Sequence, residues 1–392
     1  MGRVKLLALC GALVVAAGCS DTSPVGPSAT SNGAKDNGLL TNAAWYGGAG
    51  PGAMPIRIYS QNVYPGFNID TVSAALERAI ESNDPSIFFT ALTIGMAVFD
   101  STDWRERAAR MVLEIERQDP DVVSLNEMIT LDRQGFGLLY AYHILPIDFA
   151  DGKTDFLGVF EQELAKRGLH YKLVDSLPLT NALVDLSGPL GLQDLTVYAR
   201  YQDRDALFVR QDVGVANVKA DTFTVAFQEV VSQLRGWIGA DLTARGKTWH
   251  FVETHPDPAW VGSPTHIQEL LASVASVTLP VIIAGDLNLE PSANEHAQLL
   301  NAGFVDLWTS RRGPAPTDNP NGFTCCESDA LRNPAPTLVK RIDYVMARPA
   351  GGYRVGPVRF SIFGDDLAER TATGMWPADH AGLLVGLVMQ HN

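Results

Sequence analysis

Residues 281–288 read VIIAGDLN, an apolar run that ends in two polar side chains. The apolar residues 281–284 predict a short buried strand. Asp286 and Asn288 follow at the end of that strand, where a rigid sheet holds a side chain in place for chemistry. Because they stand two residues apart along an extended segment, we expect both side chains to face the same way.

Five other apolar segments carry polar residues at a predicted strand boundary. They are IRIYSQN, which ends at Asn62; DVVSLNE, which ends at Glu127; HFVETH, which ends at His255; RIDYVM, which has Asp343 near its start; and WPADHAGLLVGL, which has Asp379 and His380 before its apolar run. A single Asn or Glu at such a place is more often a turn or capping residue. Six boundaries in succession, all with oxygen or imidazole donors, indicate one composite site.

The rest of the chain alternates helical and strand patterns. Helices are predicted at 70–83, 87–99, 104–118, 156–167, 265–277 and 295–302, and strands at 56–62, 121–125, 171–174, 205–209, 213–218, 249–254, 281–284, 341–347 and 383–389. Residues 130–151, with scattered aromatics and glycines, are interpreted as an irregular insertion. Because several strands are linked as hairpins, the pattern predicts an α/β fold in which two mixed sheets pack face to face with helices outside.

Composition limits the functional classes. Hydrophobic residues make up 46% and charged residues 19% of the 392 residues, which excludes wholesale disorder. The net charge is −14, and no basic run is present, so strong binding to duplex nucleic acid is not expected. A phosphate substrate bridged by a divalent cation remains compatible with this charge, because the cation inverts the local field.

The N-terminus predicts export. Residues 1–19 have two basic residues, an apolar run too short to span a membrane, and the sequence AAGC ending at Cys19. This is similar to a bacterial lipobox, which predicts a lipid anchor on Cys19 and a cell-envelope location; an ordinary cleaved signal and secretion are the alternative. Residues 20–54 are rich in Ser, Thr, Asn, Gly and Pro and predict a flexible tether. Residues 55–392 are the predicted catalytic domain, without a transmembrane helix.

The cysteines offer few disulfide pairings. Cys10 would leave with the signal and Cys19 would be acylated, so Cys325 and Cys326 remain, and they are adjacent. The alternatives for this pair are a vicinal disulfide and two free thiols. A zinc site is not expected, because no second pair of ligands accompanies them.

The ordered motifs Q-N, N-E, T-H, G-D-L-N, R-I-D-Y and D-H resemble the endonuclease/exonuclease/phosphatase superfamily, which includes deoxyribonuclease I, apurinic endonucleases, neutral sphingomyelinases and inositol polyphosphate 5-phosphatases. The resemblance extends from Ile56 to Met389. It implies a four-layered α/β sandwich and the hydrolysis of a phosphate ester by in-line attack of water.

The resemblance also implies a metal site. Glu127 would be the main ligand of Mg²⁺, with Mn²⁺ as a substitute, because Mg²⁺ prefers oxygen ligands. Asn62 and Asp379 would complete the site, directly or through water. Tyr64 stands where some nucleases of the family have an acidic ligand for a second metal, so whether the site binds one metal or two is left open.

The remaining motif residues would act on the phosphate. Asp286 would orient or deprotonate the attacking water, and Asn288 would donate a hydrogen bond to the phosphate. His380 would contact the scissile phosphate, with Asp343 holding its imidazole in one tautomer and in the cationic form. His255 would be a second phosphate contact or the acid for the leaving group.

The substrate is not determined by these motifs, because specificity in such folds depends on loops. The first hypothesis is a monomeric enzyme that cleaves a small or lipid phosphodiester, as sphingomyelinases do, or a phosphomonoester. An extracellular nuclease is the alternative within the same chemistry. A non-catalytic surface lipoprotein that kept the fold as a binding module is the alternative from another class.

Overall fold

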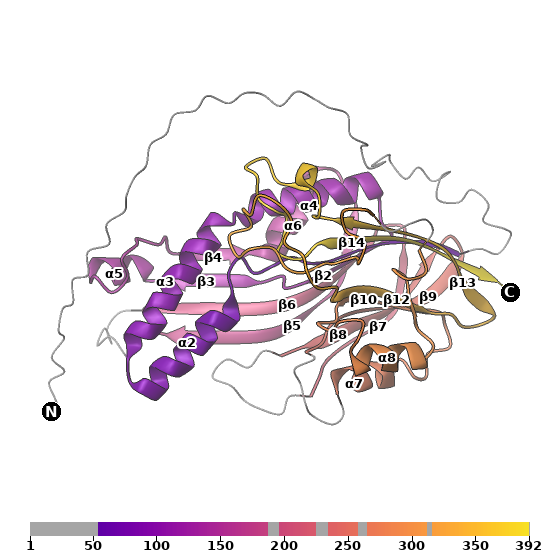
Figure 1. Cartoon of the computed structure of the whole chain (residues 1–392), viewed down its shortest axis with the longest axis horizontal. Helices are drawn as coiled ribbons and strands as arrows, with labels where there is room; N and C mark the ends of the chain where they lie inside the picture. Colours follow the sequence, from indigo (N-terminus) through magenta and orange to yellow (C-terminus); the bar gives the residue numbers. More distant parts are fainter. Residues whose placement is uncertain (1–53, 187–195, 225–233, 258–264, 312–315, 392) are drawn as a thin grey trace. The chain divides into compact units, whose positions relative to one another are not determined.

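The fold is built around two β-sheets, A and B, in a computed structural model that describes residues 54–186, 196–224, 234–257, 265–311 and 316–391 (Figure 1). By its internal contacts the chain divides into residues 1–38 and 39–392, and all described residues belong to the second unit. The predicted signal peptide, Cys10, Cys19 and nearly all of the predicted tether therefore lie outside the described residues.

Sheet A has eight strands in the order β13-β14-β1-β2-β6-β3-β4, with β5 also paired to β6. Its strands are β1 (Met54–Asn62), β2 (Val122–Asn126), β3 (Thr130–Gln134), β4 (Gly152–Asp155), β5 (Tyr171–Asp185), β6 (Tyr198–Arg210), β13 (Tyr353–Phe363) and β14 (Gly382–His391). The pair β1 and β2 is parallel, whereas β14 runs antiparallel to β1.

Sheet B has six strands in the order β11-β12-β10-β9-β8-β7. Its strands are β7 (Gly214–Thr222), β8 (Gly236–Ala244), β9 (Lys247–His255), β10 (Val281–Asp286), β11 (Val305–Asp306) and β12 (Asp343–Arg348). The pair β9 and β10 is parallel, and β12 runs antiparallel to β10. Both sheets are therefore mixed, as predicted.

Three apolar cores separate four layers. Successive residues of a strand point to opposite faces, so Ile58 of β1 packs in the core between the sheets while Tyr59 packs under the helices of sheet A. In the same way Ile282 of β10 faces sheet A, and Ile283 packs in the third core under the helices of sheet B. The order is therefore helices, sheet A, sheet B, helices, and the predicted fold class is confirmed.

The helices lie on the outer faces of the sheets (Figure 1). They are α2 (Ile69–Ser82), α3 (Pro85–Ser101), α4 (Trp104–Gln118), α5 (Phe136–Ala141) and α6 (Phe156–Lys166) with sheet A, α7 (His266–Ser273) and α8 (Asn294–Asn301) with sheet B, and a short 3₁₀ turn η1 (Leu367–Glu369). No single described helix is long and apolar enough to cross a membrane; α3 and α4 meet that requirement only together, as a pair bent by 46°.

Helix α4 illustrates how the sequence sets these elements. The side chain of Asp103 caps its first turn by accepting hydrogen bonds from the backbone N–H groups of Arg105 and Glu106. The helix stops at Asp119, which has a left-handed backbone, just before Pro120. Its apolar residues recur on one buried face against sheet A.

The structure corrects the predicted elements at the edges of sheet A. The region 130–151 is not an irregular insertion, because it contains β3 and α5. Strand β3 has the sequence TLDRQ, in which the apolar alternation that identifies a strand is short. The strand predicted at 171–174 continues to Asp185 as β5, in which few side chains are fully buried. Strand β13, which was not predicted, is interrupted by a register shift between Val355 and Val358.

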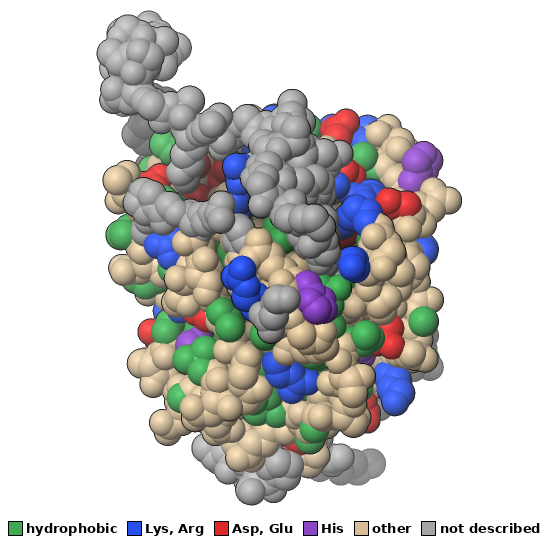
Figure 2. Space-filling view, turned by 90° about the vertical axis from the view of Figure 1, so that its right-hand side faces the viewer, with side chains coloured by type: hydrophobic (Ala, Val, Ile, Leu, Met, Phe, Trp, Pro, Cys, Tyr) green, Lys and Arg blue, Asp and Glu red, His purple; other side chains and the backbone are tan. Residues whose placement is uncertain are grey.

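Charged side chains are spread over one face of the molecule (Figure 2). Figure 2 shows one face of the molecule, on which basic, acidic and neutral side chains are interspersed where described residues cover it. That face has no continuous basic area among the side chains that the structure describes.

Candidate active site

The strand directions bring the predicted site residues to one end of the two sheets. Parallel strands end at the same edge, so Asn62 of β1 and Glu127 after β2 are neighbours in sheet A. In sheet B the ends of β9 and β10 place His255 beside Asp286. Strands β12 and β14 run in the opposite direction and begin at this edge, which adds Asp343, Asp379 and His380.

Gly285 determines how Asp286 leaves strand β10. Its φ is +146°, and a Cβ at this position would lie 2.0 Å from the carbonyl oxygen of Thr254. Only glycine fits such a close approach of β9 and β10. This explains the glycine of the GDLN motif, which lets the backbone turn so that the Asp286 carboxylate lies between the sheets.

The sequence predicted that Asn288 lies on an extended segment, and the structure shows that it does not. Its φ is +54°, in the left-handed region that asparagine tolerates. Its backbone N–H donates to Oδ1 of Asp286 at 2.8 Å, and its side-chain amide donates to the carbonyl of Pro256 at 3.3 Å. Asn288 is partly exposed, so its amide lies at the rim of the site and braces the turn after His255.

Glu127 has a strained backbone. Its φ is +62°, which costs about 1–3 kcal/mol for a residue other than glycine. The strain turns the chain out of β2 immediately after Asn126, and the Glu127 side chain becomes partly exposed while its neighbours are buried. Strain of this kind persists only where the surrounding structure enforces it, which agrees with a functional position.

Asn126 joins the two sheets behind the site. Its Oδ1 accepts the backbone N–H of Asp286 at 3.0 Å. Its Nδ2 donates to the carboxylate of Glu253 and, at 3.4 Å, to the carbonyl of Thr254. A second cross-sheet contact is made by Asn62, whose Nδ2 donates to Oδ2 of Asp286 at 3.2 Å. The position of the Asp286 carboxylate is thus fixed from sheet A.

His380 is paired with Asp343. Its Nδ1 lies 2.9 Å from Oδ2 of Asp343 and 3.8 Å from Oδ2 of Asp286. Burial alone would lower the pKa of His380, but the carboxylates of Asp343, Asp286 and Asp379 outweigh burial and raise it well above its usual value. These carboxylates therefore favour the cationic form of the imidazole.

The backbone on both sides of this pair is held in place. The carbonyl of His380 accepts a hydrogen bond from Nε2 of Gln61 at 3.0 Å, and the backbone N–H of Asp343 donates to Oγ1 of Thr324 at 3.2 Å. The neighbouring Cys325 and Cys326 form a disulfide, one of the two alternatives for this pair. The backbones of Cys325 and His380 form an isolated antiparallel β-bridge. Disulfide sulfurs offer no thiolate for a metal.

His255 is fully buried between Arg235 and Asp286. Its Nδ1 lies 2.7 Å from Nη1 of Arg235 and 3.9 Å from Oδ1 of Asp205, and its Nε2 lies 3.5 Å from Oδ2 of Asp286. Burial, followed by the positive charges of Arg235 and His380, lowers the pKa of His255 well below its usual value. The two histidines of the site are thus driven to opposite protonation states.

The carboxylates of the site fit a divalent cation. Burial, followed by the charges of Asp203 and Asp379, raises the pKa of Glu127 to about 8, and burial is also the main cause that raises the pKa of Asp379 to about 6. Oδ1 of Asp379 is buried and has no hydrogen-bond partner among the described residues. Uncompensated oxygen donors of this kind are what Mg²⁺ binds.

Two other observations bear on the ligand set. The Asn62 amide oxygen accepts the backbone N–H of Tyr64 at 3.0 Å, which leaves its second lone pair for a cation. Donor atoms of Asp286, Asp343 and His380 also lie within 4.8 Å of one another. This second trio is therefore another group of donors that could hold a cation.

Several charged residues between the sheets were not among the predicted site residues. They are the buried Asp203 and Asp205 of β6 and Glu253 of β9, and the partly exposed Arg235 just before β8. Burial raises the pKa of each of the three carboxyl groups, whereas Asp203 and its neighbours hold the pKa of Arg235 above its usual value despite burial. A signal for the carboxyl groups was present, since charged residues inside apolar strands are rarely structural alone.

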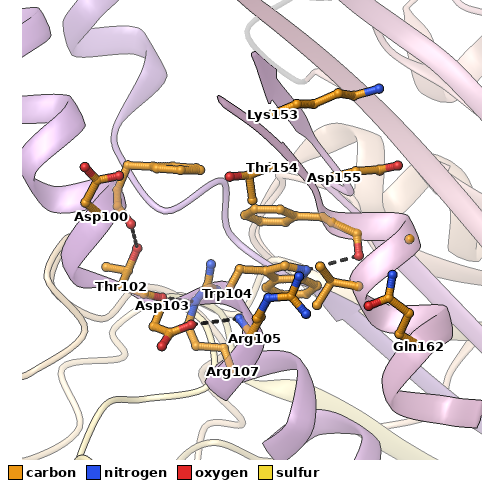
Figure 3. Close-up of a pocket in the computed structure, with 14 residues that line it drawn as sticks. Asp100, Thr102, Asp103, Trp104, Arg105, Arg107, Lys153, Thr154, Asp155 and Gln162 are labelled. Atoms are coloured by element: carbon orange, nitrogen blue, oxygen red, sulfur yellow. Dashed lines mark hydrogen bonds between the residues drawn. The ribbon is translucent and has the colours of Figure 1, made fainter. Parts of the chain in front are cut away.

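A pocket of about 420 Å³ lies away from this chemistry, between the junction of α3 with α4 and the start of α6 (Figure 3). Asp100, Trp104, Arg107, Lys153 and Asp155 are among its lining residues. None of the eight predicted site residues lines it.

A sequence profile described as the Endonuclease/Exonuclease/phosphatase family matches residues 94–380 of the chain. Two solved structures are similar to this one. An endonuclease/exonuclease/phosphatase family protein from Leptotrichia buccalis C-1013-b has 14% identity and a TM-score of 0.51, covering 85% of this chain and 99% of its own. One from Bacteroides thetaiotaomicron has 13% identity and a TM-score of 0.50, covering 87% of this chain and 100% of its own. No curated protein sequence matches significantly.

Proposed function

Because this chain belongs to the endonuclease/exonuclease/phosphatase family, we propose that it is an exported, divalent-metal-dependent hydrolase of a small or lipid phosphodiester. Members of the family are typically phosphoester hydrolases. The observation that carries the proposal is the position of the Asp286 carboxylate, which lies 3.5 Å from Nε2 of His255 and 3.8 Å from Nδ1 of the cationic His380. A proton acceptor beside two groups suited to a phosphate is the arrangement that in-line hydrolysis requires.

Glu127, Asn62 and Asp379 would hold the cation, with Mg²⁺ as the expected ion and Mn²⁺ as its substitute. When bound, the cation neutralises charge that develops on the phosphoryl oxygens. The acidic cluster alone would repel a phosphate, so the cation and His380 together provide the positive charge that the substrate needs.

Asp286 would orient the attacking water and accept its proton. Burial, followed by the charge of Asp343, raises the pKa of Asp286 to about 6. A carboxylate with this pKa is still ionised at neutral pH and is a stronger base than an ordinary aspartate, because the best catalytic pKa lies near the working pH. The backbone N–H of Asn288 keeps the other carboxylate oxygen fixed at 2.8 Å.

His380 and Asn288 would bind the phosphoryl oxygens. The cationic His380 donates from Nε2, since Nδ1 is engaged by Asp343 at 2.9 Å. Hydrogen bonds of this charge-assisted kind strengthen as negative charge develops, and removing one such donor costs about 100- to 1,000-fold in kcat. Asp343 does not need to touch the substrate, because its role is to hold the imidazole.

A small or lipid substrate is favoured over duplex DNA by charge. The chain has 30 basic and 44 acidic residues. Strong duplex binders neutralise several phosphates with lysine and arginine. Near the site, the partly exposed Arg235 lies among carboxylates, and Arg204 donates to Thr130 at 2.8 Å, so both arginines already have partners within the protein.

The decisive experiment is a substrate panel measured at equal ionic strength. We would compare kcat/KM on bis-p-nitrophenyl phosphate, p-nitrophenyl phosphate, sphingomyelin, inositol phosphates and plasmid DNA, with Mg²⁺ and with chelator. The proposal expects Mg²⁺-dependent turnover that is highest on a small or lipid diester and lost with chelator. Plasmid DNA as the best substrate, with cleavage that falls steeply with salt, would establish the nuclease instead. No turnover on any substrate would favour the non-catalytic binding module.

The location in the cell envelope rests on Cys19, and the lipid anchor is a separate part of the proposal. The sequence AAGC would make Cys19 the acylated first residue of the mature chain. In a bacterial host that processes lipoproteins, the protein is expected to fractionate with membranes, and Cys19→Ala is expected to move it to the soluble exported fraction. Unchanged membrane fractionation of the variant would contradict the anchor while leaving the hydrolase proposal intact.

A further inference from the structure

Arg107 of α4 is a fully buried arginine, and within the described part of the chain its guanidinium donates only to backbone carbonyls. Nε donates to Thr102 at 2.7 Å, Nη1 to Val63 at 2.6 Å and to Pro377 at 3.2 Å, and Nη2 to Tyr64 at 3.1 Å. Buried arginines are usually paired with carboxylates. Here the fork of donors is used to join separate pieces of backbone.

Three of these four carbonyls, those of Val63, Tyr64 and Pro377, belong to the loops that follow Asn62 and precede Asp379, two of the three predicted metal ligands. Val63 directly follows Asn62, and Pro377 stands two residues before Asp379. A single nitrogen, Nη1, therefore connects the loop after β1 with the loop before β14. Arg107 is 44 residues from Val63 and 270 residues from Pro377 in the sequence, so the two loops are more than 300 residues apart.

The guanidinium is itself held rigidly. It lies over the rings of Trp104 at 5.0 Å and of Tyr64 and Phe156 at 5.7 Å. Trp104 and Phe156 stack with centroids 4.2 Å apart, and the Trp104 indole N–H donates to the Phe156 carbonyl at 3.1 Å (Figure 3). Burial lowers the pKa of Arg107 to about 10, so the guanidinium remains charged at neutral pH.

We propose that Arg107 is a positioning residue of the metal site, which holds the Val63–Tyr64 loop against the Pro377 loop so that Asn62 and Asp379 face the same cation. The inference rests on the proposed function, because it requires that these two residues help to bind the cation. It adds a residue of α4 that donates to the backbone of both loops.

The same helix provides a matched control. Arg110 is also buried, lies over the ring of Phe363 at 4.6 Å, and pairs with Glu114 at 3.4 Å. None of its described hydrogen bonds reaches the loops at Val63, Tyr64 or Pro377. Loss of a buried arginine from α4 is therefore common to Arg107→Lys and Arg110→Lys, whereas loss of the link between the loops is specific to Arg107→Lys.

The experiment measures how much Mg²⁺ each full-length variant needs, by thermal shift without substrate and by the rate of phosphodiester hydrolysis. Arg107→Lys is expected to raise the Mg²⁺ concentration for half-maximal effect by about 10- to 100-fold, the usual effect of removing a group that supports metal ligands. Arg110→Lys is expected to leave that concentration unchanged even if it lowers Tm. Equal Mg²⁺ requirements in Arg107→Lys and wild type would overturn the inference.

A second variant covers the case in which Arg107→Lys does not fold. Trp104→Phe keeps an aromatic ring under the guanidinium but removes the indole N–H that donates to Phe156. We expect a smaller rise in the Mg²⁺ requirement, and no rise would count against the inference. If wild-type protein shows neither a thermal shift nor hydrolysis with Mg²⁺, the proposed function is wrong, and this inference, which depends on it, is wrong as well. A wild-type response shared fully by the variants removes only the role of Arg107.

Discussion

Nη1 of Arg235 lies 2.7 Å from Nδ1 of His255. A guanidinium can only donate, so Nδ1 is the acceptor and the proton of the neutral imidazole is on Nε2. That Nε2–H lies 3.5 Å from Oδ2 of Asp286, at the centre of the site. Of the two roles expected for His255, we infer that of a neutral donor to a phosphate oxygen, because a neutral imidazole is a weak acid for a leaving group.

This protonation state predicts a pH effect on stability. The pKa of His255 is lowered from 6.5 by burial and then by Arg235, so below about pH 6.5 the unfolded state binds a proton that the native state does not. The buried imidazole therefore makes the free energy of unfolding fall as pH falls from 6.5 towards the lowered pKa, by up to about 1.4 kcal/mol per unit. Urea unfolding in chelator is expected to show a shallower fall for His255→Gln; parallel curves would contradict the assignment.

Asp286→Asn should separate catalysis from stability. Loss of the base is expected to reduce kcat by about 100- to 10,000-fold. Because burial disfavours the ionised carboxylate, the free energy of unfolding at neutral pH is expected to stay equal or to rise. Asp306→Asn is the matched control, since Asp306 is a buried carboxylate of the same sheet that pairs with Arg341 at 2.7 Å outside the site. It should lose stability and keep kcat. An active Asp286→Asn would refute the assignment.

Glu127→Gln should greatly reduce the rise in Tm that Mg²⁺ causes, which can be measured without an activity assay. A ligand present at about 100 times its Kd stabilises the native state by about 2.7 kcal/mol. We expect wild-type Tm to rise with Mg²⁺ and the Tm of Glu127→Gln to respond much less, while the metal-free Tm is unchanged or higher because the pKa of Glu127 is raised to about 8. Glu114→Gln in α4 serves as control. A full Mg²⁺ shift in Glu127→Gln would mean that the cation binds elsewhere.

Asp121 should matter for stability alone. It is fully buried and accepts the backbone N–H of Arg57 at 2.9 Å and the guanidinium groups of Arg210 and Arg245, each at 2.7 Å. Breaking a buried pair on one side costs about 3–5 kcal/mol, so Asp121→Ala is expected to lower the free energy of unfolding by that amount with kcat of the folded fraction retained. Asp212 is exposed and also pairs with Arg210, so Asp212→Ala should lower the free energy of unfolding by about 1 kcal/mol or less. Equal losses in chemical denaturation would contradict this.

The strand-end residues could be predicted because their pattern is local. An apolar run followed by Asp286, Glu127 or His255 is visible within a few residues, and parallel pairing then brings the ends together. Asp205 and Glu253 could not be placed in the same way. They stand within strands, and the sequence does not say which face of a strand meets the other sheet.

Backbone conformation at the site was equally hidden. The left-handed Glu127 and Asn288 depend on contacts made by distant segments, so an extended arrangement of GDLN was the simplest expectation and proved wrong for Asn288. Strand β3 escaped prediction for a related reason. Its pairing with β4 and β6 compensates for a weak apolar pattern, and such pairing is a tertiary effect.

The position of strand β14 determines when sheet A can be completed during synthesis. It is inserted between β13 and β1, so sheet A is completed in its interior by residues 382–391, and Asp379 and His380 enter the site with them. A nascent chain that has emerged only through sheet B still lacks two side chains of the candidate site and one neighbour of its first strand. A chain truncated before residue 379 therefore leaves the candidate site incomplete, and we expect it to be inactive in the substrate panel and prone to aggregation.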